Sequence, residues 1–157
     1  MFGAILNYAK AFRAVPRCQN PVRKVRAEAL DWLEEARADL RHASRAHRMG
    51  SSNWACFAAE QAADKALKAF LMGALKKRPI HVHDLTILHR QAQGRLRLPA
   101  SIANRLAELS AYYTTARYPN AGLNRPSASI TSTQTGNAIE IAGGMIATVE
   151  RQIAKKS

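Results

Sequence analysis

Apolar residues recur at every third or fourth position through the middle of the chain, from Asn53 to Lys77. This spacing is that of one face of an α-helix. Two such rows leave only a narrow band for polar residues. The first row comprises Cys56, Ala59, Ala63, Ala66, Phe70 and Ala74. The second row comprises Trp54, Phe57, Ala58, Ala62 and Ala69. A helix that is apolar on nearly all sides is normally covered by other helices. The pattern therefore predicts a central helix of roughly 35 Å, capped by one of residues 51–53 and stopped by Pro79.

A second helix is predicted before it, over about residues 24–47. Leu30, Leu33 and Leu40 line its apolar side. Its polar side carries like-charged pairs four residues apart, Glu35 with Asp39 and Arg37 with Arg41, so burial must hold it. The turn around Gly50 makes the two helices an antiparallel hairpin.

Three more helical segments are predicted in the second half of the chain. Asp84 can cap a short helix, and a longer one runs from residue 99 or 101 until Pro119 stops it. Residues 120–135 are small and polar, which predicts one long loop. Long loops inside compact domains are often functional. The last helix carries Ile139, Ala142, Ile146, Val149 and Ile153 on one side. Its Gly143-Gly144 pair indicates close approach by another helix, within the chain or across a dimer.

The composition shows that this all-helical chain is strongly basic. The 157 residues carry a formal net charge of +13. Such a balance fits an anionic partner (nucleic acid, nucleotide or acidic protein), and equally a basic protein that touches none of these. Residues 1–26 contain no acid but six cations: Lys10, Arg13, Arg17, Arg23, Lys24 and Arg26. Residues 1–22 are interpreted as a basic extension, rather than a targeting or membrane-surface segment, and residues 23–157 as the globular domain.

Several classes of chemistry find no support in the sequence. Two cysteines, Cys18 and Cys56, make no disulfide framework, and no apolar run is long enough to span a membrane. His81, His83 and His89 lack the cysteines or carboxylates that would complete a metal site, so we expect no metal and no cofactor. There is no glycine-rich phosphate loop or nucleophile elbow. A cytoplasmic location is expected.

The most informative polar group lies where the fourth predicted helix ends. Tyr112 and Tyr113 are followed by Arg117, Tyr118 and Asn120. Phenol rings can stack on bases, and a guanidinium binds phosphate. The alternative is structural: Tyr113 in the core, Tyr118 over the bundle end and Arg117 on a helix C-terminus.

The order of the motifs FAAEQAADKALKAF, HDL and ARYP resembles the HEPN-domain family of prokaryotic proteins over about residues 29–153. This resemblance implies an up-and-down bundle of four to five helices, a homodimer, and for many stand-alone members a minimal nucleotidyltransferase partner in a toxin–antitoxin-like pair. Other members are metal-independent endoribonucleases with an arginine and a histidine separated by four to six residues. In those, arginine steadies the phosphate and histidine transfers protons.

The chain departs from that signature at its family-like arginine. Arg117 is followed by Ala121, Gly122, Leu123 and Asn124 rather than a histidine. The bare spacing occurs elsewhere, at Arg78 with His83, Arg37 with His42, and Arg41 with His47, where chance matches are expected in so basic a chain.

Three hypotheses follow: a binding module for nucleotide or RNA, an endoribonuclease that uses Arg117 with a distant histidine such as His83, and a dimerising adaptor. The missing histidine favours the first and third. The binding candidates are Arg117, Tyr118, Asn120, Tyr112, Tyr113, Lys65, Lys68 and Arg125.

Overall fold

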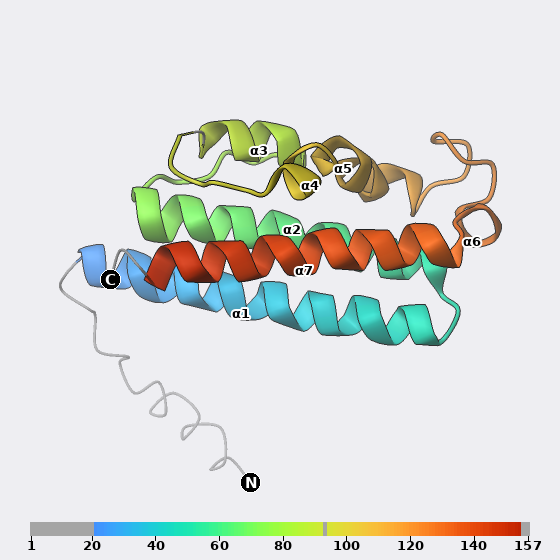
Figure 1. The fold of residues 1–157 in the computed structure, drawn as a ribbon, viewed down its shortest axis with the longest axis horizontal. Coiled ribbons are helices and arrows are strands. Elements are labelled where there is room, and N and C mark those ends of the chain that lie inside the picture. Colours follow the sequence, from blue (N-terminus) through green and yellow to red (C-terminus); the bar gives the residue numbers. More distant parts are fainter. Residues whose placement is uncertain (1–20, 93, 155–157) are drawn as a thin grey trace, which may run out of the picture.

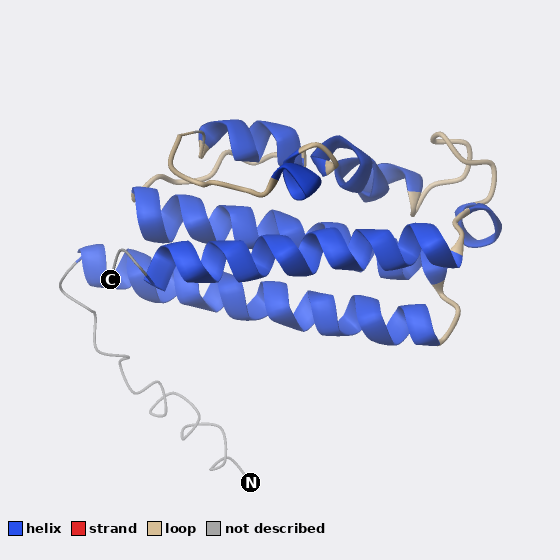
Figure 2. Cartoon of the chain, in the orientation of Figure 1, coloured by secondary structure: helices blue, strands red, loops and turns tan. Residues whose placement is uncertain are grey.

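The computed structural model describes residues 21–92 and 94–154, with side chains from residue 27 onward. The described residues form helices and no strand, so the all-α fold is confirmed (Figure 2). Apart from its last two residues, which begin the first helix, the predicted basic extension lies outside the described residues. In chain order the elements are α1 (Pro21–Arg48), α2 (Ser52–Leu75), α3 (Leu85–Gln91), α4 (Ala100–Ala103), α5 (Leu106–Thr115), α6 (Pro126–Ser129) and α7 (Ser132–Ala154).

Together with α5, the long helices α1, α2 and α7 form an up-and-down bundle, in which α1 and α5 run in one direction and α2 and α7 in the other (Figure 1). α1 and α2 are antiparallel, and α7 lies against both, running in the same direction as α2. The short α3 and α5 pack on the remaining side of α2. α2 is therefore covered on several sides, as its sequence pattern predicts.

The hairpin between α1 and α2 also agrees with the prediction. Gly50 adopts the left-handed conformation at φ +76° that glycine tolerates best. Ser51 occupies the N-cap position of α2, yet its side chain makes no capping hydrogen bond. Instead the side-chain amide of Asn53 donates to the carbonyl of Ala116 at 3.3 Å. This bond ties the start of α2 to the end of α5.

Oppositely charged side chains lie beside the like-charged pairs of α1. The ammonium of Lys65 on α2 lies 2.6 Å from Asp39 and 3.9 Å from Glu35. Glu34 likewise bridges Arg37 and Arg41, at 2.7 and 3.5 Å. Lys65 thus links α2 to α1, whereas the Glu34 pairs offset repulsion within α1 itself.

The helix predicted to end near Pro119 is broken in two, and its prediction as one piece was wrong. The chain turns at Asn104 and Arg105, which separate α4 from α5. The two pieces pack on different partners, α4 against α7 and α5 against α2 and α3. One straight helix would not reach both surfaces.

The predicted loop over residues 120–135 was too long. It contains α6, and α7 begins at Ser132. The backbone N–H of Gln134 donates to the Thr131 hydroxyl at 3.2 Å, while the Gln134 side chain accepts from the Thr131 N–H at 2.8 Å. This reciprocal capping box needs only a threonine followed three residues later by glutamine, so its signal was present in the sequence.

The close approach predicted at the glycine pair occurs within the chain. A Cβ atom on Gly144 would lie 2.7 Å from Cδ1 of Ile102 on α4, whereas one on Gly143 would meet Leu40 at 3.6 Å. Gly144 is thus the position of closest approach, where any larger residue would require the Ile102 side chain to shift. Among the described helices, none has the length and apolar character needed to cross a membrane.

Candidate functional site

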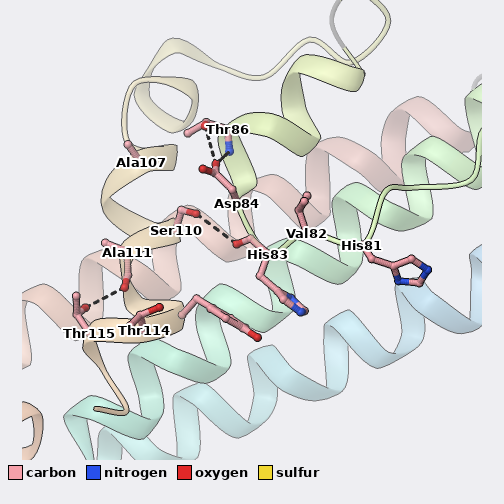
Figure 3. A pocket seen from close by; sticks show the side chains of 11 residues that line it. His81, Val82, His83, Asp84, Thr86, Ala107, Ser110, Ala111, Thr114 and Thr115 are labelled. Atoms are coloured by element: carbon pink, nitrogen blue, oxygen red, sulfur yellow. Dashed lines mark hydrogen bonds between the residues drawn. The ribbon is translucent and has the colours of Figure 1, made fainter. Parts of the chain in front are cut away.

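A groove of about 720 Å³ opens between the segment that enters α3 and the outer side of α5 (Figure 3). Its lining combines two histidines, one aspartate, one tyrosine and several hydroxyl groups: His81, Val82, His83, Asp84, Thr86, Ala107, Ser110, Ala111, Tyr113, Thr114 and Thr115. The Ser110 hydroxyl joins the two sides, since it accepts from the Leu85 N–H at 3.0 Å and donates to the His83 carbonyl at 3.4 Å.

Asp84 caps α3 as predicted. Its carboxylate accepts from the backbone N–H groups of Thr86 and Ile87, at 2.8 and 3.2 Å, and from the Thr86 hydroxyl at 2.6 Å. These bonds, that from the Thr86 side chain foremost, lower the pKa of Asp84. The cap fixes the residue immediately before it, His83, at the edge of the groove.

The rings of His83 and Tyr113 stack, with centroids 4.2 Å apart and planes 10° from parallel. The guanidinium carbon of Arg117 lies 4.3 Å from the centroid of the same tyrosine ring. Tyr113 therefore brings together an arginine and a histidine that are far apart in the sequence. This juxtaposition is the central feature of the site.

Arg117 is held by aromatic rings on further sides. Its guanidinium carbon lies 4.6 Å from the centroid of Phe57 on α2 and 4.9 Å from that of Tyr118. Cation–π contacts of this kind hold the guanidinium in position. Its Nε donates to the Tyr113 carbonyl at 2.6 Å, in the last turn of α5. The structural alternative for Arg117, binding to a helix C-terminus, thus describes part of what this side chain does.

Two buried carboxyl groups of α2, Glu60 and Asp64, belong to the same neighbourhood. Burial raises the pKa of Glu60 to about 8, despite the opposing charges of Lys68 and Arg117. Its Oε2 accepts from Gln61 at 2.8 Å, whereas its Oε1 has no partner among the described residues.

Asp64 lies between Lys68 and His83. Its Oδ2 is 2.7 Å from the Lys68 ammonium, and its Oδ1 is 3.7 Å from Nδ1 of His83. Burial raises the pKa of Asp64, against the hydrogen bond from Lys68. Glu60 and Asp64 lie in the narrow polar band of the central helix and are not among the candidate residues that the sequence suggested. Their spacing of four on an otherwise apolar helix was the available signal.

The remaining candidates are buried, engaged with other residues, or exposed in the following segment. Tyr112 is buried, and burial raises its pKa to about 12. Lys65 is engaged with α1, and Lys68 pairs with Asp64 while lying 5.8 Å from the Trp32 ring. Asn120 and Arg125 are exposed in the segment that follows α5. The structure thus groups Arg117, Tyr113 and Tyr118 with His83.

Metal binding finds no ready-made site in the described part of the chain, where no three side chains of the histidine, cysteine, aspartate or glutamate type gather. His81 points away from His83 (Figure 3).

Comparisons with known proteins give a consistent result. The model of the HEPN domain family matches residues 29–152. The crystal structure of TT1696 from Thermus thermophilus is 33% identical and superposes with a TM-score of 0.71, covering 80% of this chain and 98% of that one. A second crystal structure, that of "ST0689, an archaeal HEPN homologue", is 28% identical with a TM-score of 0.66, covering 80% and 97% respectively. A search of curated proteins finds no match.

Proposed function

The chain belongs to the HEPN-domain family, and from this premise we propose that it binds a nucleotide or an RNA strand at the groove beside α3 and α5. The observation that carries the proposal is the contact of Arg117 and His83 with one ring, that of Tyr113, at 4.3 and 4.2 Å. Guanidinium and imidazole groups both donate hydrogen bonds to phosphate oxygens. The Thr114 hydroxyl in the lining is suited to a ribose, and the net charge of +13 favours an anionic ligand.

Binding of a fluorescently labelled single-stranded RNA hexamer, measured by anisotropy, tests this function. Arg117→Ala should weaken binding roughly tenfold to a hundredfold, the usual cost of a charge-assisted hydrogen bond. Arg117→Lys keeps the charge but loses the planar fork, so its affinity should lie between the two. Arg48→Ala, an exposed arginine at the end of α1, is the matched control. Equal affinity of wild type, Arg117→Ala and Arg48→Ala would refute the proposed site.

A metal-independent endoribonuclease is the second candidate function, favoured by the position of Asp64. With Oδ1 of Asp64 3.7 Å from Nδ1 of His83, the other ring nitrogen, Nε2, is left to exchange protons with a ligand. In such a reaction His83 accepts the proton of the ribose 2′-hydroxyl, and the 2′-oxygen attacks the phosphorus. The bond to the 5′-oxygen breaks, that oxygen takes up a proton from water, His83 returns its proton to solvent, and a 2′,3′-cyclic phosphate remains. Arg117 would stabilise the charge on the phosphate oxygens.

Cleavage of a mixed RNA pool in the presence of EDTA tests the enzyme. Wild-type protein should cleave, and both His83→Ala and Arg117→Ala should lose cleavage while Arg48→Ala retains it. If His83→Ala cleaves like wild type, His83 is not the proton-transfer group. Intact RNA at high protein concentration excludes the enzyme and leaves the binding module.

The family resemblance supports two assembly proposals, a homodimer and a complex with a minimal nucleotidyltransferase in a toxin–antitoxin-like pair. Light scattering after gel filtration measures the first. Co-purification with a nucleotidyltransferase encoded beside this chain measures the second. A stable dimer that binds neither RNA nor nucleotides would identify the dimerising adaptor instead.

A further inference from the structure

A second hollow, of about 230 Å³, lies beside the groove at the C-terminal end of α2. Its lining includes Trp32 from α1 and the run Lys76, Lys77 and Arg78 that follows α2. His81 lines both this hollow and the groove, so the two adjoin. We call it the basic pocket.

The charges of the two hollows differ in a way that suggests a shared ligand. The groove lining includes no lysine or arginine, whereas the basic pocket has three such residues against one carboxylate, Glu28. Besides Arg117, which contacts the lining residue Tyr113, a polyanion seated in the groove would therefore find a row of lysine and arginine side chains in the adjoining basic pocket. Electrostatic attraction to such a row is the main source of nucleic-acid affinity.

Only one of these three cations interacts with the C-terminal end of α2, where the helix dipole is negative. The ammonium of Lys76 donates to the Gly73 carbonyl at 2.6 Å. Lys77 and Arg78 are exposed and have no side-chain hydrogen bond or ion pair among the described residues. Two cations beside a hollow are thus left free for a ligand.

We propose that the basic pocket binds the phosphates that flank the nucleotide in the groove, so that the ligand is a single-stranded RNA of several nucleotides rather than a mononucleotide. Lys77 and Arg78 contact the phosphates. The part of the half-buried Trp32 ring that lines the pocket offers an aromatic surface to a base. This inference rests on the proposed function of the groove.

The test measures the affinity of the full chain for RNA dinucleotides and hexamers over a series of salt concentrations. The wild-type protein should prefer the hexamer by roughly tenfold. The double variant Lys77→Ala/Arg78→Ala should lose that preference and reduce the slope of log affinity against log salt by about 1.4, or about 0.7 for each single-strand phosphate contact. The control Arg45→Ala/Arg48→Ala removes the same charge from exposed positions in the last turn of α1, at the opposite end of the bundle.

The outcomes separate this inference from the proposed function. If the wild type binds neither RNA, the proposed function fails and the inference fails with it. If the wild type prefers the hexamer but the double variant behaves like the control, the basic pocket is overturned while the groove stands. If polyglutamate displaces the hexamer as effectively as unlabelled RNA does, the proposal that RNA is the ligand is overturned. The single variant Arg78→Ala, expected to lower the slope by about 0.7, repeats the test with a smaller change.

Discussion

The buried carboxyl group of Glu60 should make the stability of this protein fall as the pH rises. Glu60 is fully buried on α2, with Gln61, Asp64, Lys68 and Arg117 as its polar neighbours. Burial raises its pKa from 4.5 to about 8. Between these values the folded state holds a proton that the unfolded chain has released. The contribution of Glu60 is therefore fully present below about pH 4.5 and is lost as the pH approaches 8.

The size of this effect follows from the shift in pKa. One pKa unit corresponds to about 1.4 kcal/mol, so the loss between the two pKa values is on the order of 5 kcal/mol. Replacing Glu60 with glutamine keeps the shape and the neutral state of the side chain but removes the titration. The variant should lie within about 1 kcal/mol of wild type at pH 5 and exceed its free energy of unfolding by several kcal/mol at pH 8.5.

Urea unfolding followed by circular dichroism at pH 5, 6.5 and 8.5 measures the difference. Glu140→Gln on α7 is the matched control, since Glu140 is exposed. Its difference from wild type should stay constant across this range. If Glu60→Gln also shows a constant difference, the carboxyl group of Glu60 does not titrate with a raised pKa, and the reasoning is wrong.

Three further predictions concern packing, capping and the site. Both Gly144→Ala and Gly136→Ala gain helix propensity, but only the new methyl group at position 144 must displace the tip of the Ile102 side chain. Gly136→Ala meets nothing within 4 Å and should raise the free energy of unfolding by up to about 1 kcal/mol, and Gly144→Ala should be less stable than Gly136→Ala by about 1 kcal/mol; thermal melts of both variants check the order. Asp84→Ala removes the α3 cap and should cost about 1 kcal/mol by the same melts, while Asp84→Asn should keep most of it. Tyr113→Leu removes the ring shared by His83 and Arg117, so RNA affinity should fall by an amount similar to that of Arg117→Ala; unchanged anisotropy would show that the ring does not organise binding.

Features governed by sequence neighbours were largely predictable. The spacing of apolar residues located α1, α2 and α7, and the carboxylate of Asp84 located the start of α3. Both signals are local, because a helix joins residues three or four apart. The capping box of Thr131 and Gln134 was equally local, and overlooking it led to the overlong loop.

The break between α4 and α5 was not predictable in the same way. It depends on what lies opposite each segment, α7 for Ile102 and α2 for α5. The sequence shows apolar residues at a continuous spacing and says nothing of two separate partners. Helix propensity is too weak to oppose such packing.

The sequence by itself therefore determined the helical class, the buried central helix and the residues that could bind an anion. Only the tertiary structure decided which of them meet. It set His83 and Arg117 against one tyrosine, engaged Lys65 with α1, buried Tyr112, and joined the groove to the basic pocket at His81. The physical reason is that helices form through contacts between near neighbours in the chain, whereas a site forms where separate helices pack and bring distant side chains within a few ångströms.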